Sequence, residues 1–221
     1  GNGGSQNAYT SFEHTNYHFD VKVSALQGAL DRLARFFVEP LFDERYVERE
    51  RLAVQAEYAS KRRADSQRAF EAFKQVINAD HPFARFSVGS TKTLQDLPGK
   101  PIRARLIKFF DSHYRAGNMS LVVVGRESLD VLENWVRSGF SGIPSGRTVE
   151  AYTDVPLFVD GKLPARLDVA PLKEYRRVTL TFPAPSLHGR YASKPLHYIA
   201  NIMGDEGPGS LLSSLRAQGL A

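Results

Sequence analysis

The stretch of sequence that decides the fold is GGSQNAYTSFEHTNYHFDVKV, residues 3–23. Every second residue from Tyr17 to Val23 is apolar, which is the pattern of a half-buried strand. Residues 7–12 have the composition of a shorter strand, and the polar residues 13–16 that of a turn. The stretch therefore predicts an antiparallel β-hairpin.

The rest of the chain alternates between expected helices and short expected strands. Helical spacing of apolar residues, with capping or breaking residues at the ends, predicts helices at 24–38, 43–63, 67–78, 101–114, 129–139, 194–203 and 210–218. Runs of β-branched and aromatic residues predict further strands at 118–125, 166–170 and 176–182. The expected fold class is α/β, an α+β sandwich in which a mostly antiparallel sheet packs on helices.

Residues 141–161 carry Gly, Pro and Ser without helical periodicity, and we interpret them as a linker. The linker separates a partial first domain, residues 1–140, from the start of a second domain, residues 162–221. A strand pair with one and a half helices cannot cover both faces of a sheet. We therefore expect the second domain to be truncated in this chain.

The composition excludes several classes of protein. The 221 residues include no cysteine, which excludes a disulfide framework, a thiolate zinc site and a cysteine nucleophile. Hydrophobic residues make up 42%, too many for a disordered chain, and no run of about 18 apolar residues predicts a membrane span. The net charge is +5, but the basic residues are interspersed with acidic ones, which is typical of solvated helix faces rather than nucleic-acid-binding patches.

Two glutamates of the expected helix 43–63 fall within its apolar stripe. At about 100° per residue, Glu50 and Glu57 lie roughly 60° and 80° from Val47 and about 10.5 Å apart along the axis. A carboxylate in such a stripe requires a cation or strong hydrogen-bond donors. Two interpretations remain open: a structural salt bridge with an arginine, or a metal ligand or catalytic acid.

The histidines do not decide between these interpretations. His14 and His18 are four residues apart in the expected hairpin, without a carboxylate at ligand spacing. His81 precedes a proline, and His113 and His197 are lone residues on expected helices. Neither HExxH nor HxxEH occurs in the chain.

Five blocks of the sequence, taken in order, resemble the pitrilysin/insulin-degrading enzyme family of zinc metallopeptidases, the M16 peptidases. They are GGSQNAYTSFEHTNYHFDV at 3–21, RERLAVQAEY at 49–58, NADHPFARFSVGSTKTL at 78–94, YRAGNMSLVVVG at 114–125 and YASKPLHYIANIMGDEGPGSLLSSLRAQGLA at 191–221. The last block is similar to the start of the family's second, catalytically silent domain. It departs from the family's usual HEGPGS turn by carrying Asp205 in place of the histidine.

The resemblance implies a zinc site to which this chain contributes only part. Family members bind zinc through two histidines of an HxxEH motif, whose glutamate is the general base, and one distal glutamate. The distal ligand corresponds to Glu57 and a supporting glutamate to Glu50, whereas HxxEH is expected upstream of this chain. We therefore expect Zn²⁺ in the intact protein, none bound to this fragment, and an exposed Glu57 carboxylate.

The resemblance also implies an edge strand that receives substrate as an added β-strand, by main-chain pairing with little sequence preference. The corresponding residues are Asn7, Ala8, Tyr9 and Thr10. From the residues alone, a core hairpin is the alternative. Peptides are the expected partners, with no nucleic acid and no membrane. Uncovered edges at 17–23 and 176–182 predict that the fragment also self-associates.

The expected activity of the intact protein is that of a bacterial zinc endopeptidase, which hydrolyses peptides with metal-activated water. The chain as given is expected to be inactive. The alternative is a non-catalytic M16-like peptide-binding or partner subunit, which the two glutamates in an apolar stripe disfavour. For the compartment, periplasmic is preferred over cytoplasmic.

Overall fold

The computed structural model describes residues 2–85, 87–147, 154–174, 176–185, 187–190 and 192–220. The chain divides into two compact units, Gly1–Glu174 and Tyr175–Ala221. The domain boundaries expected from the sequence stay a prediction, and part of the expected linker, residues 148–153, lies outside the described residues.

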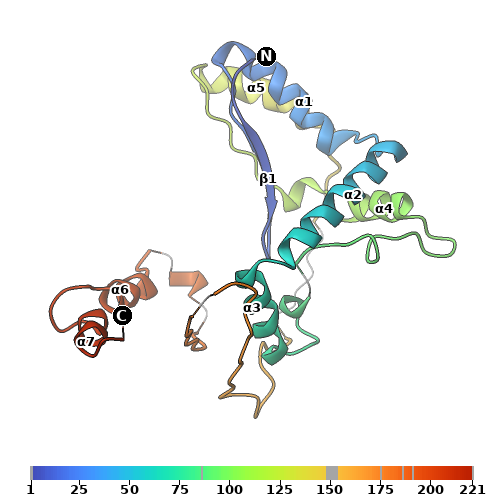
Figure 1. Cartoon of the computed structure of the whole chain (residues 1–221). Coiled ribbons are helices and arrows are strands. Elements are labelled where there is room, and N and C mark those ends of the chain that lie inside the picture. Colours follow the sequence, from blue (N-terminus) through green and yellow to red (C-terminus); the bar gives the residue numbers. More distant parts are fainter. Residues whose placement is uncertain are drawn as a thin grey trace. The chain divides into compact units, whose positions relative to one another are not determined.

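The described residues form seven α-helices and one two-stranded antiparallel sheet, in agreement with the predicted α/β class (Figure 1). The strands are β1 (Gln6–Thr10) and β2 (Thr15–Phe19). The helices are α1 (Leu26–Val38), α2 (Glu44–Lys61), α3 (Asp65–Phe73), α4 (Ile102–His113), α5 (Leu129–Phe140), α6 (Pro195–Met203) and α7 (Leu211–Ala217). Short 3₁₀ turns occupy Val23–Ala25, Lys74–Val76, Pro82–Ala84, Ala116–Asn118 and His188–Arg190. None of the helices in the described part is long and apolar enough to cross a membrane.

Two predicted helix starts need correction. Ser24, the first residue of the predicted helix 24–38 and its expected N-cap, lies inside a 3₁₀ turn. The N-cap position of α1 belongs to Ala25, which makes no side-chain cap bond. The predicted helix 67–78 is instead α3, which begins at Asp65, followed by the separate 3₁₀ turn Lys74–Val76. Helix ends depend on local hydrogen bonding, so sequence periodicity locates a helix end only to within about a turn.

The expected strands at 118–125, 166–170 and 176–182 are not formed among the described residues. The apolar run at 118–125 is typical of a buried strand, yet Val122 and Val124 are 84% and 87% exposed. Their apolar, β-branched composition favours extended backbone, but a strand requires a partner for its ladder of hydrogen bonds. Within the described chain, only the hairpin supplies one.

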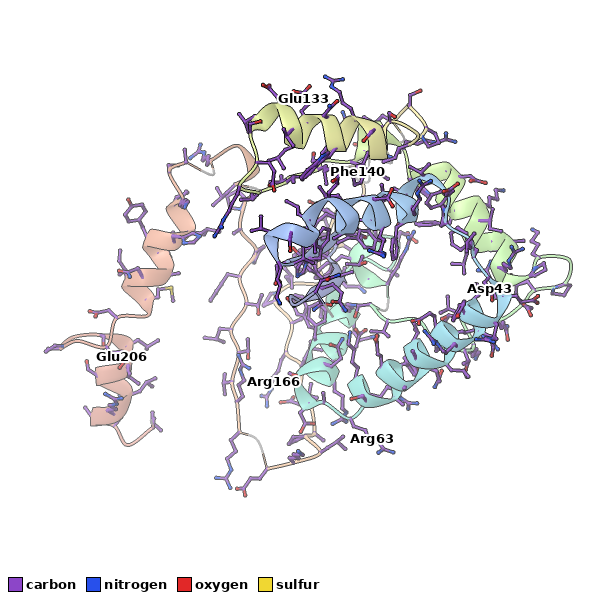
Figure 2. The ribbon with its side chains drawn as sticks, turned by 90° about the horizontal axis from the view of Figure 1, so that it is seen from above. Asp43, Arg63, Glu133, Phe140, Arg166 and Glu206 are labelled. Carbon is purple, nitrogen blue, oxygen red and sulfur yellow. The ribbon has the colours of Figure 1, made fainter. Side chains whose placement is uncertain are left out.

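The core of the first unit lies between α1 and α5, which run side by side (Figure 2). Leu30 and Ala34 of α1 and Leu132 of α5 are buried. A Cβ placed on Gly139 would lie 3.4 Å from the Cβ of Ala34, so the glycine permits the close approach of the two helices. Burying each large side chain in this way contributes about 1.5–3 kcal/mol.

The segment that follows α5 is joined to earlier parts of the first unit by hydrogen bonds from backbone N–H groups or to backbone carbonyls. The Asn78 backbone N–H donates to the carbonyl of Leu157 at 2.9 Å. Farther along, the Asp65 carboxylate accepts the backbone N–H groups of Leu172 (2.8 Å) and Lys173 (3.1 Å). The bond from Leu172 is the main cause that lowers the pKa of Asp65.

The second unit consists of an extended segment, α6, a glycine-rich turn and α7. Ser210 caps α7 by accepting the backbone N–H of Ser213 at 3.1 Å. In the turn, Asp205 accepts the backbone N–H of Gly207 at 3.3 Å, a local bond that an aspartate makes readily. Large apolar side chains of this unit are exposed, among them Val178, Leu180, Phe182, Tyr198 and Ile202.

Candidate functional site

The hairpin is the first of two elements that carry predicted site residues. Its hydrogen-bond pattern determines which backbone groups face outward. Beyond the strand ends, the N–H of Asp20 donates to the carbonyl of Ser5 at 2.9 Å. At the turn, the N–H of Ser11 donates to the carbonyl of His14 at 2.8 Å. Both pairs continue the register of β1 and β2. In an antiparallel ladder such hydrogen-bonded pairs recur at every second residue.

The backbone of Asn7 and Tyr9 consequently faces β2, whereas that of Gln6, Ala8 and Thr10 faces the outer edge of β1. In the described part of the chain this outer edge pairs with no other strand, and all five residues of β1 are exposed. Its middle N–H, that of Ala8, is bonded to the side-chain oxygen of Asn7 at 2.8 Å. An added strand would take the place of that side chain.

The two faces of the hairpin differ. Tyr17 points toward the helices, where its ring lies 5.4 Å from that of Phe37 and its hydroxyl 2.6 Å from the hydroxyl of Tyr114. Burial, together with this hydrogen bond, raises the pKa of the Tyr114 hydroxyl. The opposite face carries Tyr9, whose ring meets those of His14 and His18 edge-on. Contacts with Phe37 and Tyr114 therefore support the face of the hairpin that carries Tyr17.

The tip of the hairpin rests on a second aromatic cluster. The ring of Phe12 lies 4.6 Å from Phe83 and 6.4 Å from Phe70. Below them Lys74, only 4% exposed, donates to Glu71 at 3.1 Å and to the carbonyl of Arg85 at 2.6 Å. A buried ammonium group is stable only with such partners, so these bonds hold the cluster in place.

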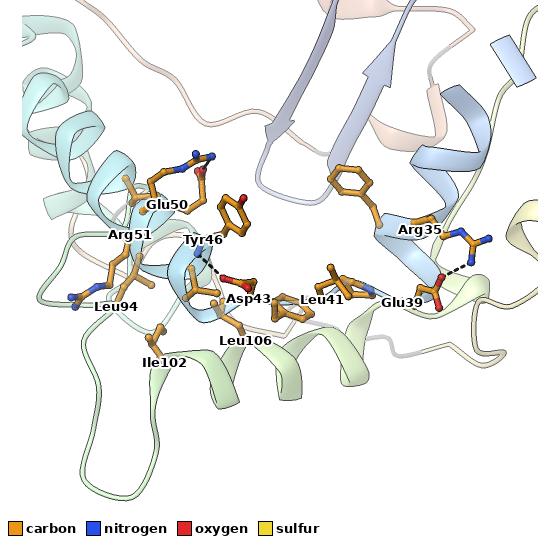
Figure 3. Close-up of a pocket in the computed structure, with 16 residues that line it drawn as sticks. Arg35, Glu39, Leu41, Asp43, Tyr46, Glu50, Arg51, Leu94, Ile102 and Leu106 are labelled. Atoms are coloured by element: carbon orange, nitrogen blue, oxygen red, sulfur yellow. Dashed lines mark hydrogen bonds and ion pairs between the residues drawn. The ribbon is translucent and has the colours of Figure 1, made fainter. Parts of the chain in front are cut away.

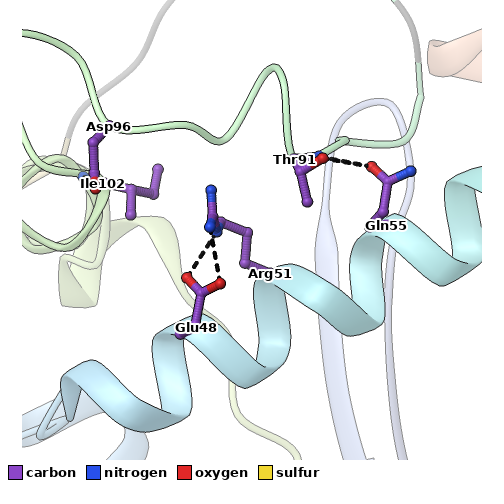
Figure 4. A network of polar contacts seen from close by, with 6 residues as sticks. All are labelled: Glu48, Arg51, Gln55, Thr91, Asp96 and Ile102. Atoms are coloured by element: carbon purple, nitrogen blue, oxygen red, sulfur yellow. Dashed lines mark hydrogen bonds and ion pairs between the residues drawn. The ribbon is translucent and has the colours of Figure 1, made fainter.

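Helix α2 is the second candidate element, and it begins where the sequence predicts. The carboxylate of Asp43 accepts the N–H groups of Arg45 and Tyr46, which satisfies donors of the first turn. Farther along, Gln55 accepts both the N–H and the hydroxyl of Thr91 (Figure 4). These bonds join α2 to the loop that precedes α4.

A charged pair lies next to this junction. Arg51 donates two hydrogen bonds to the carboxylate of Glu48, at 2.9 and 2.8 Å (Figure 4). The pair lowers the pKa of the Glu48 carboxyl. Asp96 in turn accepts the N–H of Ile102 at 2.7 Å and so satisfies a donor at the start of α4. The Glu48–Arg51 pair therefore lies within α2, whereas the bond to Asp96 joins the loop to the start of α4.

Glu50 and Glu57 do not lie in a buried stripe, contrary to the sequence-based expectation. No residue of α2 is buried, and its partly covered face consists of Val47, Arg51, Val54, Gln55 and Tyr58. Both glutamates flank that face and are exposed. Glu50 has Arg49 at 3.7 Å, and both side chains are mostly exposed, so the attraction is weak. The exposure expected for Glu57 agrees with the structure.

A cavity of about 900 Å³ lies between the end of α1, the first half of α2 and the start of α4 (Figure 3). Its wall is mostly apolar and includes Phe36, Leu41, Val54, Leu94, Ile102 and Leu106. Glu50 borders this cavity, whereas Glu57 is not one of its lining residues. Glu57 therefore does not share this cavity with Glu50.

The donor set of this chain does not by itself fit a zinc ion. Among the described residues, no group of three or more His, Asp or Glu side chains is placed to hold a metal. Glu57 supplies one exposed carboxylate, whereas a protein zinc site takes three or four ligands. A zinc ion bound to Glu57 would therefore need further ligands besides this carboxylate.

Several residues that shape the hairpin were missed by the sequence analysis. Asp20 and Ser5 join the two strands at its open end, Lys74 supports its tip, and Tyr114 supports its middle. The tertiary contacts of Lys74 and Tyr114 have no signature in sequence spacing. The Gly3–Gly4 pair before Ser5 was a detectable signal, since adjacent glycines mark a backbone that other residues cannot adopt.

Comparison with known proteins agrees with this architecture. A family profile described as "Insulinase (Peptidase family M16)" matches residues 1–88, and one described as "Peptidase M16 inactive domain" matches residues 101–221. The structure is similar to that of pitrilysin, with a TM-score of 0.79 at 30% identity, covering 99% of this chain and 23% of that one. This likeness supports the predicted α/β fold.

Relatives of known sequence give the same result. Human insulin-degrading enzyme is 41% identical over 220 residues, which are 98% of this chain and 22% of that protein. A Schizosaccharomyces pombe protein named "Putative zinc protease mug138" is 39% identical over 99% of this chain and 23% of its own length. The chain thus spans about a quarter of the curated relatives it matches. Since the two profiles together match nearly all of its sequence, the chain belongs to peptidase family M16.

Proposed function

We propose that this chain supplies the peptide-binding edge, and one metal ligand, of a zinc-dependent endopeptidase. The observation that carries the proposal is the outer edge of β1, where the backbone of Gln6, Ala8 and Thr10 faces away from β2 in an exposed strand. Anchors at the middle and tip of the hairpin keep this edge extended. An extended peptide can pair with such an edge through main-chain hydrogen bonds.

The relatives support the rest of the proposal. Their names describe a zinc protease and an enzyme that degrades insulin. Glu57 is the proposed zinc ligand and Glu50 the supporting carboxylate, and both are accessible on α2 to residues outside this chain. When bound, zinc would activate water for peptide hydrolysis. The chain alone, with a single ligand, is proposed to bind peptides without cleaving them.

Peptide binding is tested with a fluorescein-labelled insulin B chain and fluorescence anisotropy. The wild-type chain is expected to bind it, and a version of the peptide that is N-methylated at alternate residues is expected to bind at least about tenfold more weakly, because it lacks one row of donors. A scrambled peptide is expected to bind about as well as the original. Equal affinity for the N-methylated peptide would show that main-chain pairing is not the mode of binding.

A pair of proline substitutions locates the edge. Ala8→Pro removes an outward N–H of β1 while leaving the pairing with β2, and it should weaken peptide binding. Thr15→Pro is the matched control, since it removes an outward N–H of β2. The proposal fails if Thr15→Pro weakens binding and Ala8→Pro does not. Cleavage of the peptide by the chain alone with added Zn²⁺ would contradict the proposed inactivity.

A further inference from the structure

The open end of the hairpin is closed by a side chain rather than by the backbone. Ser5 and Asp20 occupy a hydrogen-bonded pair of the ladder, and Asp20 donates its N–H to the Ser5 carbonyl as expected. The reciprocal bond is different. The Ser5 N–H donates to the carboxylate of Asp20 at 3.1 Å, and the Ser5 hydroxyl donates to the other carboxylate oxygen.

The preceding backbone explains why a side chain takes this place. Gly3 and Gly4 have φ angles of +60° and +112°, which turn the chain sharply before the strand begins. A Cβ on Gly4 would lie 2.0 Å from the carbonyl oxygen of Asp20, so the glycine backbone passes directly over that oxygen. The Asp20 carboxylate therefore becomes the acceptor that the ladder requires at Ser5.

We propose that Asp20 is a positioning residue for peptide binding: its carboxylate fastens Ser5 and thereby keeps the outer edge of β1 straight enough to pair with an added strand. This inference rests on the proposed function. The reason is the shortness of β1, which has only five residues. Loss of the bond at Ser5 leaves two glycines, the most flexible residues, at its entrance. Fraying then extends to Gln6 and Ala8, whose backbone would meet the peptide.

Removal of the carboxylate is the first part of the test. Asp20→Ala is expected to weaken binding of the labelled insulin B chain about tenfold and to speed amide exchange at Asn7 and Tyr9 by a similar factor, because charge-assisted bonds are lost. Asp20→Asn should have an intermediate effect, since it retains one acceptor oxygen. Amide exchange in α5 should be unchanged in both variants. Asp31→Ala, which removes an exposed carboxylate of α1, is the matched control.

A disulfide then separates positioning from direct contact with the peptide. Gln6 and Phe19 form a non-hydrogen-bonded pair of the ladder, a geometry in which the Cα atoms are close enough for a disulfide. The chain has no other cysteine to interfere. In the Asp20→Ala background, Gln6→Cys with Phe19→Cys should restore peptide affinity under oxidising conditions and lose it again under reduction.

The outcomes are distinct. Weakened binding by Asp20→Ala that the disulfide restores supports the positioning role. Wild-type affinity in Asp20→Ala, or weakened binding that the disulfide does not restore, would overturn it while leaving the proposed peptide site intact. If the wild-type chain fails to bind the labelled peptide, the proposed function fails first and the inference about Asp20 falls with it.

Discussion

The β1–β2 hairpin and the segments 118–125 and 176–182 are similar in residue composition but differ in structure. All are rich in β-branched and aromatic residues, yet only the hairpin forms a sheet among the described residues. In the hairpin, four residues separate the two paired strands, the bonds between Ser5 and Asp20 close the open end, and aromatic contacts support the middle and the tip. The other segments have Val122, Val124, Val178 and Leu180 largely exposed. Composition favours extended backbone, but the strand itself depends on a partner.

The largest expected effect concerns the unpaired segments. We predict that the chain self-associates, because Val178, Leu180 and Phe182 are 88%, 77% and 76% exposed. Changing all three to Thr should weaken association at least about hundredfold, since each buried side chain contributes about 1.5 kcal/mol or more. Leu41→Thr, at an 86% exposed position, should leave association unchanged. Light scattering across a dilution series measures this, and a wild-type monomer of 24.7 kDa at the highest concentration would refute it.

The next effect is at the entrance to the hairpin. Gly4→Ala should destabilise the first unit by about 3 kcal/mol, because it combines a backbone strained for any other residue with a clash against Asp20. The matched control is Gly99→Ala, whose φ is +67° with no atom within 4 Å of the added Cβ. It should cost only about 1 kcal/mol. Equal losses in urea unfolding would show that the contact with Asp20 is unimportant.

The contacts of Lys74 under the hairpin tip should contribute somewhat less to the free energy of unfolding. Lys74→Met removes a buried charge that Glu71 and the Arg85 carbonyl satisfy, and it should destabilise the unit by about 2 kcal/mol. The double variant with Glu71→Gln should lose less than the sum of the two single variants. Additive losses, measured by urea unfolding, would mean that the pair is not coupled.

A single hydroxyl tests the middle of the hairpin. Tyr17→Phe keeps the ring contact with Phe37 but removes the hydrogen bond to Tyr114, and it should cost about 1 kcal/mol. It should also lower the raised pKa of the Tyr114 hydroxyl toward the ordinary value, because the hydrogen bond and the charge interaction with Tyr17 are lost while burial remains. Ultraviolet titration of tyrosine ionisation measures that change. An unchanged titration curve would argue against the bond.

The smallest expected effect is a pH dependence of the bonds between Ser5 and Asp20. Hydrogen bonds from the Ser5 hydroxyl and N–H lower the pKa of Asp20 below its usual range. The stabilisation is therefore complete above the ordinary carboxyl pKa of about 3.9 and is lost as the pH falls through the lower folded value. The protection factor of the Asn7 amide, which removes the intrinsic pH dependence of exchange, should fall from pH 5 downward in the wild type and not in Asp20→Asn.

Much of this architecture could be predicted from local sequence. The hairpin, the Asp43 cap and the positions of the helices follow from alternation, periodicity and capping residues. Periodicity alone failed for the glutamates of α2. It placed Glu50 and Glu57 in an apolar arc, but which arc of a helix becomes covered depends on its neighbours. In α2 the partly covered face includes Val47, Val54 and Tyr58 as expected, but it extends toward Gln55, which contacts Thr91, and not toward the glutamates.

The contact between Asp65 and residues 172–173 has a consequence for the order of folding. It joins groups 107 positions apart, and chain entropy opposes the closure of such a loop. At a synthesis rate of about 5–20 residues per second, roughly 5–20 s separate the appearance of the two partners on the ribosome. During that interval the Asp65 carboxylate has only local partners such as Arg68 of its own helix, which lies at 3.0 Å in the structure. Its bonds to residues 172–173 can form only after both segments have been synthesised.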